Sequence, residues 1–359
     1  MNKRIRYLVR REIRALFELK KTERLWHFPV LASLCVGIPL LIGLFFGKLN
    51  YAILSCTGGL VILYLPAAAP GKRMVTMLGC SLGFMLSLAI GLLFSFNAFV
   101  SSLMLGILAF GVHWITRYFN LKSPGNFFFI MLVSMGSCMP YQLSIIPQKV
   151  VLIGMGTLLA CVLAFCYGQL LKQKKLTKKE VAPVPQRRYS SVIDSAIIGL
   201  VVGLSLLVAH LLQLSNPYWV PISCIAVMQG ISTRHVWQRS LQRILGTYIG
   251  LGITWVILSF HLTPLSVCIS ILVLQFVVEM LIVRHYGLAV IFVTPLTLLL
   301  AEAGRAMSVN PATLVSARFI DIVLGSLIGA LGGWVLYHRQ LHAKAERQIR
   351  KVRIAVLRR

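Results

Sequence analysis

VLIGMGTLLACVLAFCYGQLLKQKKLTKKEVAPVPQRRY, residues 151–189, contains both features that decide the fold of this chain. Its first part is an uncharged apolar run long enough to cross a bilayer core, which needs about 20 residues. Its second part combines seven lysines and arginines with two helix-breaking prolines, Pro183 and Pro185. A membrane span followed by a basic linker predicts a membrane protein that is divided in two at this point.

Similar apolar runs occur on both sides of the linker. Six precede its basic residues, over 28–47, 51–70, 74–96, 98–115, 125–141 and 150–171. Six follow it, over 193–214, 218–231, 241–260, 264–283, 286–304 and 312–337. The 359 residues are 58% hydrophobic and 13% charged, with a mean hydropathy of +0.83. We therefore expect an all-α polytopic membrane protein with about 12 transmembrane helices.

The positions of the lysines and arginines predict the topology. If the N-terminus is cytoplasmic, only Lys48, Lys149, Arg305 and Arg318 of the 36 basic residues lie outside the cytoplasmic side. This bias predicts that both termini are cytoplasmic. The formal net charge of +27 is then explained by topology and by attraction of the basic tails to anionic lipids, with no role in nucleic-acid binding.

The linker and the tails divide the chain into five expected segments. Residues 1–25 carry apolar positions at helical spacing between basic ones, which predicts a cytoplasmic amphipathic helix. Residues 172–190 and 339–359 are the basic linker and the basic tail. Residues 26–171 and 191–338 are the two membrane halves, with six spans each.

The two halves show signs of an internal repeat. Sliding one half along the other by 167 positions aligns Lys72 with Arg239, and it aligns Gly79 with Gly246. Because each half has an even number of spans, both halves enter the membrane from the same side. The sequence therefore predicts two parallel six-helix repeats related by an axis along the membrane normal.

Catalytic and metal-binding motifs are missing from the sequence. It contains no HExxH, no GxSxG and no Walker loop, so we expect neither an enzyme nor an ATP-driven pump, and no resident cofactor. The eight cysteines lie in or beside apolar runs without a CxxC pair. We interpret them as apolar packing residues and expect no metal site.

The span at 218–231, YWVPISCIAVMQGI, is too short to cross the membrane comfortably and contains Pro221, Ser223 and Gln229. Its counterpart in the first half holds Ser55 and Thr57 before two glycines. Paired short or interrupted spans at equivalent positions indicate a transporter's substrate site, because freed backbone groups can face a ligand. The alternative is that these small residues only allow close helix packing.

The next span contains a basic residue and two glycines on one side of a helix. Gly246 and Gly250 are four residues apart, so this helix can accept a neighbour at close range, and Thr247 lies beside them. Arg243 lies near the cytoplasmic rim. It either extends to the interface or presents a cation to an anionic substrate.

The last span, ARFIDIVLGSLIGALGG, places a cation and a carboxyl inside the membrane. Counted from Pro311, Arg318 lies about 10 Å and Asp321 about 15 Å along the helix axis. The two are three residues apart and can pair on one face, which is one interpretation. In the other, Asp321 is a proton-carrying carboxyl.

These motifs together resemble the fusaric acid resistance protein-like (FUSC) family. Its pattern has an aromatic pair opening one span, R-x-x-G-T-x-x-G in the next and R-x-x-D with following glycines in the last. These motifs correspond here to Tyr218 and Trp219, to Arg243, Gly246, Thr247 and Gly250, and to Arg318, Asp321, Gly325 and Gly329. The resemblance covers about 190–340 and is faint in the first half, where Thr76 and Cys80 replace the arginine and the threonine.

The resemblance implies an exporter of aromatic carboxylic acids in the bacterial inner membrane, distantly similar to plant aluminium-activated malate transporters. We predict a secondary transporter of organic anions with proton coupling through Asp321. The expected substrate-binding residues are Ser55, Thr57, Tyr218, Trp219, Ser223, Gln229, Arg243, Thr247 and Arg318. The alternatives are an uncoupled anion channel and a lipid-interacting scaffold.

Partners other than the substrate are also expected. The basic tails favour anionic lipids. The glycine-lined spans favour a homodimer. A periplasmic accessory protein is a further candidate partner.

Overall fold

The computed structural model describes residues 24–66, 68–121, 123–173, 188–260, 263–302 and 311–338. Within these ranges the regular structure is entirely helical, which confirms the predicted all-α class. Residues 1–23 of the expected N-terminal helix, most of the linker and the tail from 339 lie outside the described residues.

Each predicted apolar run corresponds to one α-helix. The first half comprises α2 His27–Phe45, α3 Leu49–Gly59 with the 3₁₀ turn η1 Leu60–Tyr64, α4 Pro70–Leu93, α5 Ala98–Tyr118, α6 Phe127–Ser137, and α7 Ile146–Gln173 after the 3₁₀ turn η2 Leu143–Ile145. The second half comprises α8 Arg188–Leu211, α9 Trp219–Met228, α10 Thr233–Ser259, α11 Pro264–Leu281, α12 Tyr286–Glu302 and α13 Pro311–Leu336.

The helices fall into a long and a short class. Eight segments of the described chain are long and apolar enough to cross a membrane. The shorter apolar helices are Leu49–Tyr64, Phe127–Ser137, Trp219–Met228 and Tyr286–Leu300. These four are the second and the fifth helix of each half. The chain is therefore a polytopic membrane protein in which equivalent helices are shortened in both halves.

Two predicted boundaries were wrong, each for a local reason. α10 begins at Thr233 rather than at 241, because Ser232 Oγ accepts a hydrogen bond from the backbone N–H of His235 (3.2 Å) and caps the helix. The second span ends at Tyr64 rather than at 70. Pro66 disfavours helical backbone in the residue before it, and Pro70 instead opens α4.

The two halves repeat the same internal packing. In the first half α2 packs on α3 and α7, α4 packs on α6 and α7, and α3 packs on α7. In the second half the equivalent helices form the same pairs: α8 packs on α9 and α13, α10 packs on α12 and α13, and α9 packs on α13. This correspondence is what the predicted repeat requires.

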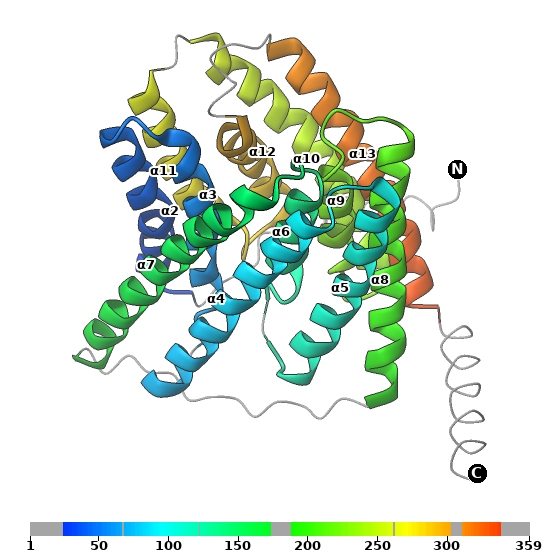
Figure 1. Ribbon diagram of the computed structural model, residues 1–359, viewed down its shortest axis with the longest axis horizontal. Coiled ribbons are helices and arrows are strands. Elements are labelled where there is room, and N and C mark those ends of the chain that lie inside the picture. The colour runs from blue at the N-terminus through cyan, green and yellow to red at the C-terminus, as the bar shows by residue number, and fades with distance from the viewer. Residues whose placement is uncertain are drawn as a thin grey trace, which may run out of the picture.

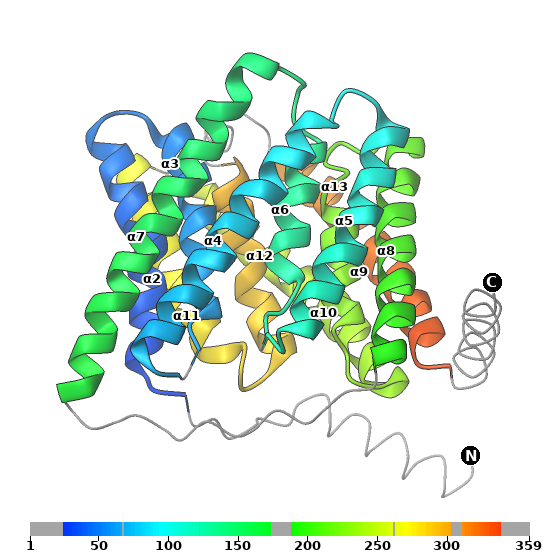
Figure 2. The same ribbon diagram turned by 60° about the horizontal axis from the view of Figure 1, so that its bottom comes forward.

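The two most extensive contacts between the halves are equivalent. The fourth helix of one half packs on the first helix of the other, which pairs α5 with α8 and α11 with α2. Figure 1 shows these pairs at opposite sides of the bundle, with α9 and α12 between them. Figure 2 shows α7, α4, α5 and α8 side by side across one face. The short helices thus lie inside a frame of long ones.

Glycines set the closest helix contacts. A Cβ added at Gly246 would lie 2.8 Å from the carbonyl oxygen of Gly287, and one at Gly250 would lie 2.5 Å from that of Ile291, so α10 packs directly on the backbone of α12. Gly325 and Gly329 of α13 approach the backbone of α9 in the same way. The glycine stripes that favoured a homodimer are therefore filled by helices of the same chain.

Candidate functional site

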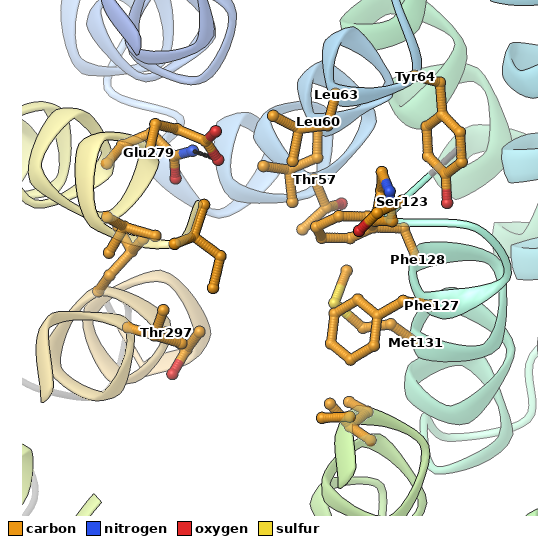
Figure 3. Close-up of a pocket in the computed structure, with 18 of the residues that line it drawn as sticks. Thr57, Leu60, Leu63, Tyr64, Ser123, Phe127, Phe128, Met131, Glu279 and Thr297 are labelled. Atoms are coloured by element: carbon orange, nitrogen blue, oxygen red, sulfur yellow. Dashed lines mark hydrogen bonds between the residues drawn. The ribbon is translucent and has the colours of Figure 1, made fainter. Parts of the chain in front are cut away.

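A cavity of about 1280 Å³ lies between the two halves. All four short helices contribute side chains to its wall, and Figure 3 shows Glu279 and Thr297 on one side of it and Phe127, Phe128 and Met131 on the other. Its size is enough for a drug-sized ligand, for which sites of about 300–1,000 Å³ are usual.

Irregular backbone explains why the lining helices are short. α3 changes to a 3₁₀ turn after Gly58 and Gly59. α6 begins only after Pro124 and Gly125, and Gly125 has a φ of 57°. Non-helical backbone at membrane depth is tolerated where it lines a cavity, and this cavity is bounded in part by such segments.

The cavity wall is aromatic and cationic. Eight aromatic side chains line it: Phe28, Tyr64, Phe119, Phe127, Phe128, Tyr218, Trp219 and Tyr286. Six cationic side chains also line it, namely Arg24, Lys72, Lys149, Arg239, Arg243 and Arg318, whereas Glu279 is the one acidic side chain among its described lining residues. A low-dielectric cavity with this excess of positive charge attracts anions.

The cationic residues occupy both ends of the cavity. Lys72 lies in the first turn of α4, Arg239 in the second turn of α10, and Lys149 in the first turn of α7. Because consecutive helices joined by short loops run antiparallel, α4 and α10 begin at one face of the bundle and α7 begins at the other. A ligand between them meets positive charge at both ends and apolar side chains in the middle.

Arg239 and Arg243 form a cluster with Tyr286. The Arg239 guanidinium lies 4.0 Å from the centre of the Tyr286 ring, and Arg243 Nη1 donates a hydrogen bond to the Tyr286 hydroxyl (3.3 Å). Arg243 Nη2 donates to Ser223 Oγ (3.1 Å), and Arg239 Nε donates to the carbonyl oxygen of Ala226 (3.1 Å). Neither arginine has an ion-pair partner among the described residues. Two guanidinium groups held only by neutral partners are suited to binding an anion.

Arg318 joins three cavity-lining helices. Its guanidinium lies 3.0 Å from the centre of the Trp219 ring, and its Nη2 donates a hydrogen bond to Thr297 Oγ1 (2.8 Å). Cation–π contact with tryptophan is strongest where water is excluded, and Arg318 is only 5% exposed. The predicted pairing of Arg318 with Asp321 is not seen: both Asp321 oxygens are buried without a hydrogen-bond partner in the described structure.

Glu279 lies at the α2–α11 contact. Its Oε2 is 2.9 Å from Arg24 Nη2, and Gln275 Nε2 donates a hydrogen bond to its Oε1 (3.3 Å). Arg24 could not be predicted as its partner from residue spacing, because the two residues are 255 positions apart.

The predicted site residues divide into two groups. Those that line the cavity are Thr57, Tyr218, Trp219, Gln229, Arg243 and Arg318. Those that do not are Ser55, Ser223, Thr247 and Asp321, all of which are buried. Ser223 still contacts the cavity residue Arg243, whereas Thr247 Oγ1 has no hydrogen-bond partner among the described residues.

Three kinds of lining residue were missed by the sequence analysis. Lys72 and Arg239 had been aligned by the repeat but were assigned to cytoplasmic loops, although both lie in helices. Glu279 and Tyr286 lie outside the motifs found in the sequence. Of the eight cysteines, Cys138 lines the cavity and Cys166 is exposed, whereas the other six are buried, as expected of packing residues: Cys35, Cys56, Cys80, Cys161, Cys224 and Cys268.

Together these features define a polytopic membrane protein with a cationic cavity between two similar halves. Residues 204–332 match the family model described as "Fusaric acid resistance protein-like", which confirms the resemblance for the second half. The matched stretch contains the cavity residues Trp219, Arg243 and Arg318.

One curated relative supports the membrane assignment. Over 125 residues the chain is 37% identical to the "Uncharacterized membrane protein YvaC" of Bacillus subtilis (strain 168). The match covers 35% of this chain and 20% of that protein, so the chain matches about a fifth of the relative's length. No solved structure matches the chain. The similarity to plant malate transporters stays a prediction.

The cluster around Tyr286 makes a stability prediction. Tyr286→Phe removes the hydroxyl that accepts from Arg243 but keeps the ring under Arg239, so we expect a loss of about 0.5–1.5 kcal/mol in unfolding free energy. Denaturant titration in detergent micelles measures it. Tyr248→Phe, on the exposed side of α10, is the control and should change stability by less than about 0.5 kcal/mol. Equal effects of the two variants would contradict a stabilising hydrogen bond between Arg243 and the Tyr286 hydroxyl.

Proposed function

We propose that the chain is a secondary transporter that exports organic anions, specifically aromatic carboxylates, across the bacterial inner membrane. The observation that carries this proposal is the cavity between the halves, with six cationic side chains against one acidic side chain in its described lining. The family match and the bacterial membrane relative support the same class. The proposal involves no catalytic reaction and no cofactor.

The cavity has complementary groups for both parts of an aromatic carboxylate. Arginine binds a carboxylate through parallel N–H donors, and Arg243 and Arg318 lie on walls of the cavity. Aromatic side chains favour contact with other rings, and Tyr218 and Trp219 already form a tilted pair with ring centres 4.9 Å apart. A benzoate-like anion would therefore place its ring among the aromatic side chains and its carboxylate against an arginine.

Asp321 is the proposed site of the coupling proton. It is fully buried and lies one helical turn from Arg318, and its carboxyl oxygens accept no hydrogen bond from the described residues. An uncompensated buried charge is costly in free energy, so a carboxyl in this position is suited to binding a proton reversibly. A homodimer, a periplasmic accessory protein and anionic lipids at the basic tails remain proposals for partners.

Transport into inside-out vesicles tests the proposal. Energised vesicles containing the wild type should accumulate radiolabelled 4-hydroxybenzoate, and a protonophore should abolish the accumulation. Asp321→Asn should remove this protonophore sensitivity while the protein stays folded. Accumulation by Asp321→Asn that is equal to the wild type and equally sensitive to the protonophore would remove Asp321 from the mechanism.

One observation favours a second function, an uncoupled anion channel. The lining of a single cavity includes Lys149 near one face of the bundle and Lys72 and Arg239 near the other. A pathway open at both ends would conduct anions without coupling. Planar-bilayer recordings separate the two functions, because a channel passes 4-hydroxybenzoate currents without a proton gradient and a coupled carrier does not.

A further inference from the structure

Glu279 forms an ion pair with Arg24, one of the arginines that line the cavity. Arg24 Nη2 lies 2.9 Å from Glu279 Oε2, and Arg24 Nη1 donates a hydrogen bond to the main-chain oxygen of Glu279 (3.3 Å). Both residues line the cavity. The structure thus shows Arg24 bound to a carboxylate group.

The two partners differ in accessibility. The side chain of Arg24 is 23% exposed, whereas that of Glu279 is 5% exposed. Arg24 lies immediately before α2 and packs its guanidinium on the Phe28 ring at 4.1 Å, which fixes the cation at the cavity wall. A carboxylate arriving through the cavity can therefore reach Arg24 without unfolding the helices around it.

The contact between the two residues is also incomplete. Arg24 Nη2 meets Glu279 Oε2, whereas Arg24 Nη1 donates to the main-chain oxygen, so the pair lacks the two parallel hydrogen bonds of a bidentate contact. The other carboxylate oxygen, Oε1, accepts a hydrogen bond from Gln275 Nε2, which comes from the same helix. If Arg24 leaves, Glu279 keeps this second partner. Since an arginine–carboxylate pair with parallel hydrogen bonds is stronger than a contact without them, an external carboxylate can compete with Glu279.

From these contacts we infer that Arg24 is a substrate-binding residue and that Glu279 is a resident carboxylate which the substrate displaces. This inference rests on the proposed function and deepens it, because it adds a carboxylate subsite at the contact between α2 and α11. In this exchange the ion pair between Arg24 and Glu279 breaks, and an ion pair between Arg24 and the substrate carboxylate forms. No covalent bond changes, and the charge of the protein is unaltered.

Neutralising Glu279 tests this competition. Glu279→Gln removes the competing charge and nearly preserves the shape of the side chain, so it should tighten the binding of radiolabelled benzoate by about tenfold. The double variant Arg24→Gln/Glu279→Gln should lose the gain, because the subsite then has no cation. We use the double variant because Arg24→Gln alone leaves Glu279 charged and buried with Gln275 as its partner, so this single variant would mix a change in stability with the loss of the cation.

Equilibrium binding of benzoate is measured for each variant with the full chain in nanodiscs. Asp194→Asn is the matched control: it removes one negative charge outside the cavity lining and should leave benzoate affinity unchanged. Tighter binding by Glu279→Gln alone supports the inference, even where wild-type binding is too weak to measure. Unchanged or weaker binding, or a gain that persists in the double variant, overturns it while wild-type binding still supports the proposed function. If neither the wild type nor Glu279→Gln binds benzoate, both proposals are wrong.

Discussion

Replacing Arg318 with alanine is expected to reduce 4-hydroxybenzoate transport by about 100-fold, the equivalent of about 2.7 kcal/mol. Hydrogen bonds to charged groups contribute about 1.5–3 kcal/mol, and Arg318 is a cation of the cavity wall. The substitution also removes the cation over the Trp219 ring and the donor to Thr297. Initial rates in inside-out vesicles, normalised to the amount of folded protein, give the measurement.

Two controls make this result specific to the cavity. Arg117→Ala removes a cation from the end of α5 that does not line the cavity, and it should keep wild-type rates. Arg318→Lys keeps the charge but loses the planar donor geometry, so it should retain part of the activity. Equal losses in Arg318→Ala and Arg117→Ala would show that total positive charge matters and that the cavity does not.

Replacing Gly250 with valine is expected to destabilise the protein by about 3 kcal/mol or more, because overpacking forces backbone to move. A Cβ at this position would lie 2.5 Å from the carbonyl oxygen of Ile291 and 2.7 Å from Thr294 Cβ. Both contacts are on α12, a cavity-lining helix that packs on α10. The yield of monodisperse protein and its denaturation midpoint in detergent both report the loss.

Gly252 provides a matched control on the same helix. A Cβ added there meets nothing within 4 Å, and the position is exposed. Gly252→Val should therefore change stability by less than about 0.5 kcal/mol. A comparable loss of stability in both variants would mean that the low helix propensity of valine causes it. Close packing of α10 on α12 would then not be the cause.

Patterns that operate within one span were predictable from the sequence. The excess of apolar residues gave the all-α membrane class, and the shortness of the 218–231 run pointed to a helix that lines the cavity. The spacing of Gly246 and Gly250 correctly predicted close approach of a neighbouring helix. These properties follow from residue order along a single helix.

Contacts between distant spans were not predictable in the same way. Glu279 has a basic residue five positions further along its own chain segment, Arg284, but the packing of α2 on α11 brings Arg24 to it instead. Arg318 and Asp321 share a helix and can pair by spacing, yet Trp219 and Thr297 from two other helices take the guanidinium. The partner that each buried charged side chain binds depends on how the helices are arranged, and this arrangement cannot be derived from the spacing of residues in one sequence.

Photolabelling with 4-azidobenzoate tests most directly whether the cavity binds aromatic carboxylates. This probe combines a carboxylate with a light-activated group on the ring, so it reacts where it binds. We expect mass spectrometry to find adducts on cavity-lining segments of α6 and α9, including Phe128, Met131 and Trp219, and excess 4-hydroxybenzoate to prevent them. Adducts confined to lipid-facing side chains such as Leu82 and Leu200, with no protection by 4-hydroxybenzoate, would contradict the account.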